Sequence, residues 1–285
     1  MTGSTLLTVA VLTLLVMGEA DAQFTAGLLA NESYWSDGKA EFNIYDAQLV
    51  RGGQPRHCEV LHILLRERVD PNTMGRVDDP KGSDAVAAVR MQQMWNIPLG
   101  LFIEQGSLTA WWRVNPVALA QLSFAGTDSF GNASHWLDVK SGNLLSQSYR
   151  SGASTLPISA PSDGIFIDEL PLRVRTIDFM KAPPEFQIQL GPSIVTATKL
   201  TTVQFTPARV SWKAVEKTIE VTVQQENNIN RFILDRAFPF LLREWSMPDG
   251  SKLKLKRDLK ADYWNYSQNG DRERALKNPM LQHPD

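Results

Sequence analysis

The chain has 285 residues, of which 43% are hydrophobic, and its 29 Lys and Arg against 31 Asp and Glu give a formal net charge of −2. This composition is typical of a folded globular protein and excludes a disordered or collagen-like chain. The near-neutral charge gives no electrostatic reason to expect nucleic acid as a partner. A single Cys excludes an intramolecular disulfide and any metal site built from several cysteines.

The first segment is typical of a secretory signal peptide. Residues 6–17, LLTVAVLTLLVM, carry no charge and are too few for a membrane span of about 20 residues. The small-x-small pattern Ala20-Asp21-Ala22 then predicts cleavage before Gln23. A short membrane anchor or a buried first strand are the alternatives, because no Lys or Arg precedes the apolar run. We therefore expect residues 1–22 to be a signal peptide and the protein to be periplasmic or envelope-associated, with no transmembrane segment after cleavage.

Cleavage at this position would change the charge balance. It removes Glu19 and Asp21 but no base, which leaves 29 acidic residues against 29 basic ones. The mature chain is then formally neutral, so recognition by shape and apolar contact is expected rather than long-range steering.

Period-two alternation dominates the first half and predicts strands. Residues 39–45 alternate apolar and polar side chains, residues 58–68 are rich in Leu, Val and Ile, and the intervening Arg51-Gly52-Gly53-Gln54-Pro55 is typical of a turn. These features predict an N-terminal hairpin. Residues 85–95 suit a helix by propensity but also alternate, and we favour a strand because the neighbouring segments are strands. Further strands are expected at 99–113, 117–125, 135–139 and 144–149.

Residues 152–164 are small, Pro-bearing and almost uncharged, which predicts a boundary between two β halves at 23–150 and 151–269. A short helix is expected at 168–179. Strands follow at 186–190, 194–205, 209–213, 218–225, 231–234, 238–245 and 252–259, and residues 270–285 are expected to form a polar tail. The expected fold is mainly β, with two curved antiparallel sheets or an open β-barrel and one short helix.

One block of sequence carries a resemblance. The stretch from Tyr34 to Glu41, YWSDGKAE, is followed by Tyr45 and by RGGQPR at 51–56. It resembles the opening of a family of uncharacterised exported bacterial proteins, whose members often carry a label borrowed from Maf-type septum formation inhibitors. Maf-type enzymes are cytoplasmic α/β nucleotide pyrophosphatases, so that label does not suit this strand-rich chain. The resemblance implies an envelope β-protein and no particular chemistry, and a Trp-Cys-Gly-His-like cluster associated with the family is replaced here at 126–135.

Few residues suggest catalysis. Asp128 and His135 flank a Gly-bearing turn and are candidates for a hydrolase together with Ser129, although no G-x-S-x-G motif is present. A plain β-turn is the simpler interpretation. Glycosidases use a pair of carboxylates, and the adjacent acids Asp168 and Glu169 are the candidates for such a pair. His57 and His62 are expected on opposite faces of a strand, so they cannot hold a metal together, and we expect no metal and no cofactor.

Aromatic residues suggest binding instead. Trp111-Trp112-Arg113 places one indole on each face of a strand, and one of them, together with Trp136 or Trp95, could line an apolar pocket in which Arg113 meets an acidic head group. Filling of a large core is the competing interpretation of these Trp side chains. We therefore expect a non-catalytic envelope protein that binds a lipid-like ligand or a partner protein. A hydrolase using Asp128 and His135, and a structural or assembly factor without a pocket, remain alternatives.

Overall fold

The computed structural model describes residues 23–25, 27–78, 84–161 and 163–278. Within these residues, fifteen strands form one continuous sheet in the order β8-β7-β6-β5-β4-β3-β2-β1-β15-β14-β13-β12-β11-β10-β9. Every neighbouring pair is antiparallel except β9–β10. The protein is therefore mainly β, and of the two predicted forms it takes the open-barrel one. The predicted signal peptide lies outside the described residues.

The first eight strands form a simple meander, and β10–β15 form a second one to which β9 adds in parallel beside β10. The strands are β1 Ala40–Arg51, β2 Gln54–Val69, β3 Val86–Leu99, β4 Phe102–Val114, β5 Val117–Asp128, β6 Gly131–Asp138, β7 Asn143–Ser148, β8 Gly152–Pro157, β9 Gly164–Phe166, β10 Glu185–Gly191, β11 Thr206–Val215, β12 Thr218–Gln225, β13 Asn228–Asp235, β14 Leu242–Ser246 and β15 Lys252–Ala261. The two meanders are joined through the pairing of β1 with β15, for example Phe42 with Leu259. The division of the chain into β halves at 23–150 and 151–269 stays a prediction.

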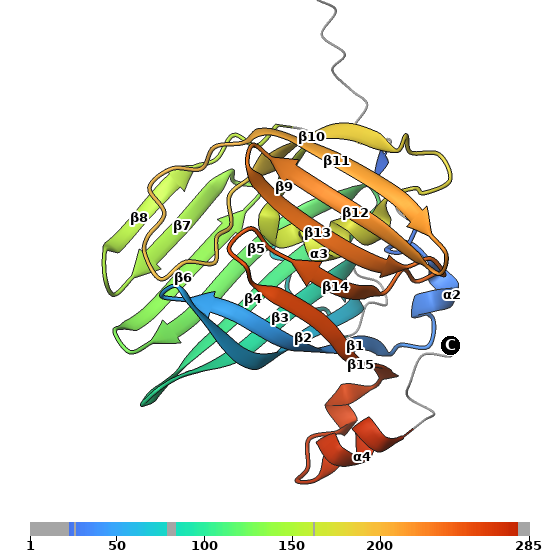
Figure 1. Ribbon diagram of the computed structural model, residues 1–285, viewed down its shortest axis with the longest axis horizontal. Helices are drawn as coiled ribbons and strands as arrows, with labels where there is room; N and C mark the ends of the chain where they lie inside the picture. The colour runs from blue at the N-terminus through green and yellow to red at the C-terminus, as the bar shows by residue number, and fades with distance from the viewer. Residues whose placement is uncertain (1–22, 26, 79–83, 162, 279–285) are drawn as a thin grey trace, which may run out of the picture.

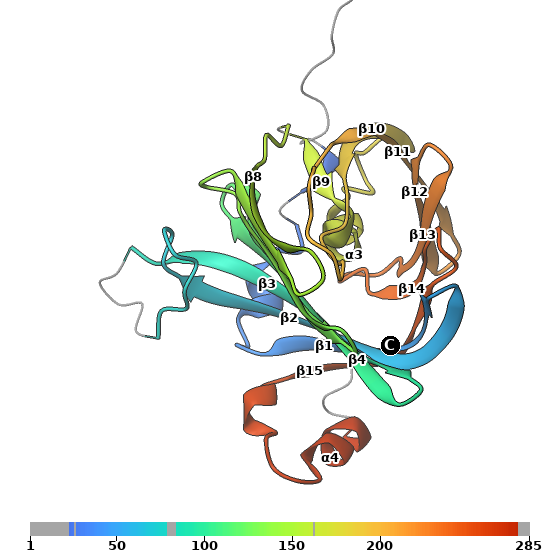
Figure 2. The same ribbon diagram turned by 90° about the vertical axis from the view of Figure 1, so that its left-hand side faces the viewer.

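Short helical segments complete the fold. They are α2 Glu32–Trp35, η1 Ile167–Glu169, α3 Leu170–Arg173, η2 Val174–Thr176, η3 Tyr263–Asn265 and α4 Asp271–Lys277. Both meanders curl, and α3 lies inside the space that they surround (Figure 1, Figure 2). Leu170, Leu172 and Val174 are buried there in the main core. The segment thus fills part of the barrel interior, because its apolar side chains face the concave side of both meanders.

Most of the predicted strands are confirmed. Arg51 pairs with Gln54 across Gly52 and Gly53, which both adopt positive φ, as the predicted turn requires. Residues 86–99 form a strand, so period-two alternation prevailed over helix propensity. On β15 Leu253 is buried while the flanking lysines are exposed, as the alternating faces of a strand require.

Four local predictions are wrong. Residues 152–157, expected in a linker, form edge strand β8, and the helix expected over 168–179 ends at 176. Residues 271–277, expected in a tail, form α4, which packs Ala275 and Leu276 against Phe42 and Leu259. The segment 194–205, expected to be a strand, has no strand partner. We call residues 192–205 the strap.

Side chains of the first meander hold the strap in place of a sheet ladder. It crosses the concave face of β6–β8, where Ser148 Oγ donates to the Ala197 carbonyl and Ser154 Oγ donates to the Leu200 carbonyl. Ser146 Oγ also accepts the Leu200 N–H. Because serine side chains satisfy the strap backbone, its β-prone sequence does not need to join the sheet.

Candidate functional site

The barrel interior contains a cavity of about 550 Å³ at one end of the molecule. In the antiparallel meander the β1–β2, β3–β4, β5–β6 and β7–β8 turns all lie at the same end, and the β14–β15 turn joins them because Gln48 pairs with Lys252. Residues in or beside each of these turns line the cavity, including Arg51, Glu104, Asp128 and Asp249. We call this the mouth end.

Large apolar side chains form the inner wall of the cavity. It is lined by Leu49, Trp95, Leu108, Phe124 and Trp245, all of which are buried. The Trp95 and Phe124 rings stack with centroids 6.0 Å apart. Trp245 Nε1 donates to Asn230 Oδ1 at 3.1 Å, so this indole is fixed on the opposite meander. The two meanders thus face each other across the cavity with aromatic surfaces.

A row of small residues crosses the inner surface of the first meander and leaves space above it. Trp95 pairs with Gly106, Gly106 with Gly126 and Gly126 with Ala133, so the four positions run across β3–β6 on one face. A Cβ at Gly106 would lie 2.2 Å from the Trp95 ring, and one at Gly126 would lie 2.5 Å from Phe124 Cζ. The aromatic rings therefore lie flat on glycine backbone, which leaves the space above them free.

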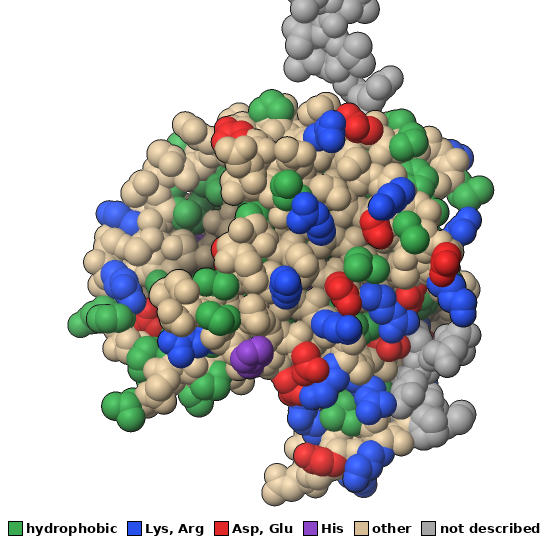
Figure 3. Space-filling view, in the orientation of Figure 1, with side chains coloured by type: hydrophobic (Ala, Val, Ile, Leu, Met, Phe, Trp, Pro, Cys, Tyr) green, Lys and Arg blue, Asp and Glu red, His purple; other side chains and the backbone are tan. Residues whose placement is uncertain are grey.

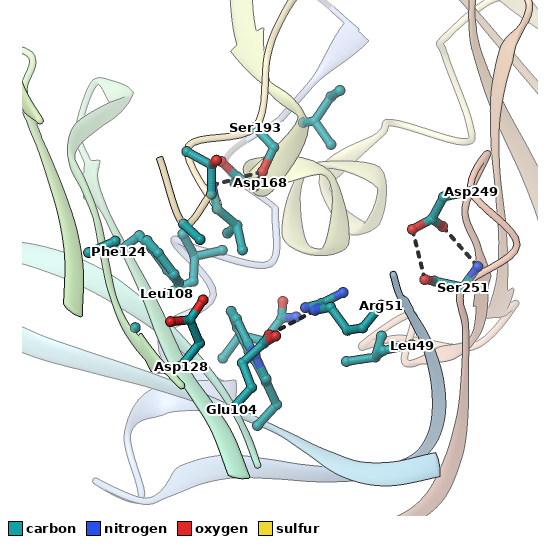
Figure 4. A pocket seen from close by; sticks show the side chains of 18 of the residues that line it. Leu49, Arg51, Glu104, Leu108, Phe124, Asp128, Asp168, Ser193, Asp249 and Ser251 are labelled. Atoms are coloured by element: carbon teal, nitrogen blue, oxygen red, sulfur yellow. Dashed lines mark hydrogen bonds and ion pairs between the residues drawn. The ribbon is translucent and has the colours of Figure 1, made fainter. Parts of the chain in front are cut away.

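Charged groups line the mouth in pairs. Arg51 Nε lies 2.7 Å from Glu104 Oε1 (Figure 4). Arg150 Nη2 lies 2.8 Å from Asp128 Oδ2. Partial burial opposes ionisation of Asp128, but hydrogen bonds from the Phe130 N–H and the Arg150 guanidinium outweigh it and lower the pKa of this carboxyl. Its charge is therefore engaged in holding the turn.

The remaining acids give the lining an excess of negative charge. Asp249 bonds the backbone and hydroxyl of Ser251. Asp168, at the start of the internal helical segment, accepts Ser193 Oγ and Ile194 N at 2.6 Å each, and so anchors the start of the strap (Figure 4). Burial raises the pKa of Asp168 to about 6. Four acids and two arginines thus line the cavity, and neither arginine lacks an acidic partner.

The strap forms another part of the wall, and His135 fixes its middle. Ser193, Val195, Thr196 and Ala197 line the cavity. His135 Nε2 lies 3.1 Å from the Thr196 carbonyl, which can only accept, so Nε2 carries the proton and Nδ1 accepts from Ser146 Oγ at 2.9 Å. The imidazole is buried, and burial lowers its pKa. His135 is thus engaged on both ring nitrogens in a structural contact.

Asp128 and His135 do not meet. Asp128 pairs with Gly131 across the β5–β6 turn, and His135 lies four residues further along β6, which corresponds to about 13 Å of strand. Asp128 contacts Arg150, whereas the hydroxyl beside His135 belongs to Ser146, which is itself buried. The geometry therefore gives no support to a triad built from the predicted pair.

The four predicted ligand-binding residues are spread over different environments. Trp112 is fully buried, and its Nε1 donates to Glu169 Oε2 at 3.0 Å. Trp111 packs in a small cluster on the other face of β4, below the guanidinium of Arg90. Arg113 donates to the Pro71 carbonyl, and Trp136 is 46% exposed. None of these four residues lines either of the two cavities described here, so a ligand-binding role for them stays a prediction.

The environments of His62 and Cys58 suit structural roles. Burial, assisted by Arg175, lowers the pKa of His62 to about 3, and its ring packs on Tyr45 with centroids 4.7 Å apart. Its Nε2 has no hydrogen-bond partner among the described residues, so this buried imidazole is not fully satisfied. Burial raises the pKa of the Cys58 thiol to about 11, which disfavours a thiolate nucleophile. Among the described residues, no three His, Cys, Asp or Glu side chains group as metal ligands.

A second cavity of about 600 Å³ lies on the outer side of the sheet, between β1–β4, β15 and α4. Its lining includes Phe42, Leu61, Met94 and Leu276. Arg272 on α4 forms an ion pair with Glu59 on β2, so α4 is tied across this space. No helix in the described part of the chain is long and apolar enough to span a membrane.

Comparisons with known proteins add little to this picture. No family model matches the chain, and no curated protein matches it. A crystal structure described as a beta-barrel-like protein of Domain of Unknown Function DUF1849 from Brucella abortus matches with 11% identity and a TM-score of 0.47, and the match covers 79% of this chain and 98% of that chain. This likeness carries no information on a ligand or an activity.

The wall residues Trp95, Phe124 and Trp245 were largely missed by the sequence analysis. Trp95 was considered only as a companion of Trp111 or Trp112, and the other two sit in ordinary alternating strands. A signal was present in Gly106 and Gly126, because a glycine inside a strand pattern often marks close approach of another group. Both glycines lie inside strands, β4 and β5, rather than in turns.

Proposed function

We propose that this chain is an exported, non-catalytic envelope protein that binds an apolar or amphipathic ligand in the cavity at the mouth end. The observation that carries the proposal is the cavity itself, whose wall is aromatic and aliphatic and whose mouth is polar. Small-molecule sites are typically concave, mostly apolar and of about 300–1,000 Å³, with a few polar groups that orient the ligand. A cavity of about 550 Å³ fits this description.

The charge of the lining narrows the ligand class. Both arginines already pair with acids, while Asp168 and Asp249 add negative charge with no basic partner among the cavity-lining residues. A carboxylate or phosphate on the ligand would meet like charge at low dielectric, which is unfavourable. The ligand is therefore an amphiphile with an uncharged polar end rather than an anionic one.

Binding of a fluorescent apolar probe tests the proposal. N-phenyl-1-naphthylamine should increase in fluorescence on binding the purified chain, and Ala133→Trp should weaken binding about tenfold or more, because the new indole fills the cavity beside Gly126. Val195→Trp on the strap fills the same space from another element, in case the first variant folds poorly. Ala118→Trp is the matched control, because Ala118 is exposed on β5 and lines neither cavity.

Competition with two ligands of equal chain length tests the charge argument. The uncharged 1-monolauroylglycerol should displace the probe at a lower concentration than laurate does. No probe binding by the parent chain, or unchanged binding by folded Ala133→Trp and Val195→Trp, would contradict a cavity site. Equal displacement by laurate would contradict only the ligand class.

Export is tested separately. Expression in a Gram-negative host followed by mass measurement of the periplasmic fraction should show a chain that begins at Gln23. Gln23 O accepts the Asp178 N–H, and Phe24 bridges to Ile177, so the expected mature N-terminus lies against the internal helical segment. A full-length chain that remains in the cytoplasm would contradict export.

A further inference from the structure

Three successive hairpins at the mouth end carry large exposed hydrophobic side chains at their tips. The β3–β4 tip presents Leu101, which is fully exposed, and Ile103, which is 55% exposed. The β5–β6 tip presents Phe130 at 59%, and the β7–β8 tip presents Tyr149 at 78%. In Figures 1 and 3 these hairpin ends lie along the lower left edge of the molecule, where hydrophobic side chains protrude. We call Leu101, Phe102, Ile103, Phe130 and Tyr149 the apolar tips.

The fold itself does not require these residues. Gly100 supplies the positive φ of the β3–β4 turn, so a polar residue would serve equally well at the next position. Leu101 contributes nothing to the core because none of its side chain is buried. Exposed large hydrophobic residues grouped at one end of a protein indicate an interaction surface.

Position connects the apolar tips with the cavity. Tyr149 both lines the cavity and is exposed, and Phe130 lies between the lining residues Asp128 and Gly131. Glu104, which follows Ile103 on β4, lines the cavity as well. The tips therefore stand on the rim through which a ligand from the cavity would leave.

We propose that the apolar tips dock on the surface of a lipid bilayer, with the mouth end of the cavity facing the lipid. The tips are separate protruding points, which can enter between lipid head groups, whereas a stable protein interface needs a contiguous complementary area of about 1,000 Å² or more. The inference goes beyond the proposed function, because docking can be measured without any cavity ligand.

The charges beside the tips favour an uncharged bilayer surface. Arg150 lies over the Phe130 ring at 4.0 Å and pairs with Asp128, and Arg51 pairs with Glu104. No cluster of unpaired lysines adjoins the apolar tips in the described residues, so binding rests on apolar insertion rather than on attraction to anionic lipid. Docking should therefore occur on zwitterionic vesicles and change little with salt.

Sedimentation with vesicles of palmitoyl-oleoyl phosphatidylcholine tests this docking. The chain from Gln23 should bind these vesicles about equally at low and high salt. Leu101→Asp together with Phe130→Asp should lower the partition coefficient tenfold or more, because each change removes a large apolar side chain from the lipid contact. Met180→Asp is the matched control, since Met180 is 93% exposed and lies before β10, at the opposite end of the sheet from the mouth.

A fluorescent label tests insertion directly. The label NBD attached at Leu101→Cys, in a Cys58→Ala background, should shift to the blue on adding vesicles, while NBD at Met180→Cys should not. Absence of vesicle binding by the parent chain, or an equal loss in Met180→Asp, would overturn the proposal. A concentration-dependent dimer without vesicle binding, dissolved by Leu101→Asp, would overturn it in favour of a protein partner. None of these outcomes affects probe binding in the cavity, so the two proposals can fail separately.

Discussion

The indole of Trp95 lies directly over the backbone of Gly106 on the neighbouring strand, where a single added carbon would come within 2.2 Å of the ring. This contact sets the floor of the cavity. It also explains why the strand carries a glycine where packing alone would favour a larger residue, since the ring occupies the space of the missing side chain.

Gly106→Ala should therefore lower the free energy of unfolding by about 1–3 kcal/mol, the usual range for overpacking a well-packed core. Urea unfolding measures this difference. The loss should be smaller in a Trp95→Phe background, because a phenyl ring occupies less of the space above Gly106. An equal loss in both backgrounds would show that Trp95 is not the source of the strain.

The buried ion pair between Arg175 and Glu41 provides a second prediction. Arg175 Nη1 and Nη2 lie 2.7 and 2.8 Å from the two Glu41 oxygens, and both side chains are almost fully buried. The pair ties the internal helical segment to β1. Removing one partner leaves the other charged and buried, so Arg175→Met should lower the free energy of unfolding by about 3–5 kcal/mol.

The double variant Arg175→Met with Glu41→Leu serves as the control for the ion pair. It should recover much of the loss, because no uncompensated charge remains in the interior. Thermal and urea unfolding of the three proteins give the comparison. A double variant as unstable as Arg175→Met alone would show that packing, and not charge, dominates at this position.

The contrast between β1 and the cavity shows what the sequence could predict. Strand positions followed from local alternation, and the β1–β2 turn followed from the Gly and Pro residues at 51–55. The burial of Glu41 and Asn43 could not be predicted in this way. Alternation in 39–45 distinguishes the two faces of the strand but does not show which face an internal segment covers. That segment is fixed by Arg175, 134 residues away, and no local pattern contains such a contact.

The cavity was harder to predict for the same reason. Its wall combines Trp95 and Phe124 with Trp245 from the other meander, and among the described strands the β1–β15 pairing is the one ladder that joins the two meanders. Trp111 and Trp112 were the predicted pocket residues because they are adjacent in sequence. Adjacent strand residues, however, point to opposite faces of the sheet. The strap was mistaken for a strand because its composition is β-prone, whereas serine side chains on β7 and β8 satisfy its backbone.

Asp168 makes stability depend on pH. Burial raises its pKa from 3.8 to about 6, so between these values the folded chain holds a proton that the unfolded chain has lost. The contribution of Asp168 to the free energy of unfolding is therefore fully present below about pH 4. It decreases as the pH rises to about 6, by an amount on the order of 2–3 kcal/mol. Carboxyls with lowered pKa values, such as Asp128, act in the opposite direction.

Comparison with Asp168→Asn isolates this contribution. The difference in free energy of unfolding between the parent and the variant should change between pH 4 and 6 and be constant above pH 7. Urea unfolding across this pH range measures it, and the carboxyl carbon of Asp168 should titrate near pH 6 by NMR. A pH-independent difference would contradict a raised pKa.

His135 controls how firmly the strap closes the cavity wall. Its Nε2–H is donated to the Thr196 carbonyl, and its Nδ1 accepts from Ser146, which in turn accepts the Leu200 N–H. His135→Phe keeps the stacking on Phe124 but removes both hydrogen bonds. We expect faster amide hydrogen exchange at Leu200 and its neighbours in the strap, with little change in β12 and β13, because the loss is local.

The pH dependence of the strap has a defined sign. Burial lowers the pKa of His135, so the folded chain stays neutral at this residue while the unfolded chain takes up a proton below about pH 6.5. Stability from His135 is thus present above that pH and is lost as pH falls through it. Hydrogen exchange of the strap in the parent chain should accelerate between pH 6.5 and 5 beyond the intrinsic rate change, while His135→Phe, already open, should follow the intrinsic rate alone. Equal pH profiles in the two proteins would show that another group holds the strap.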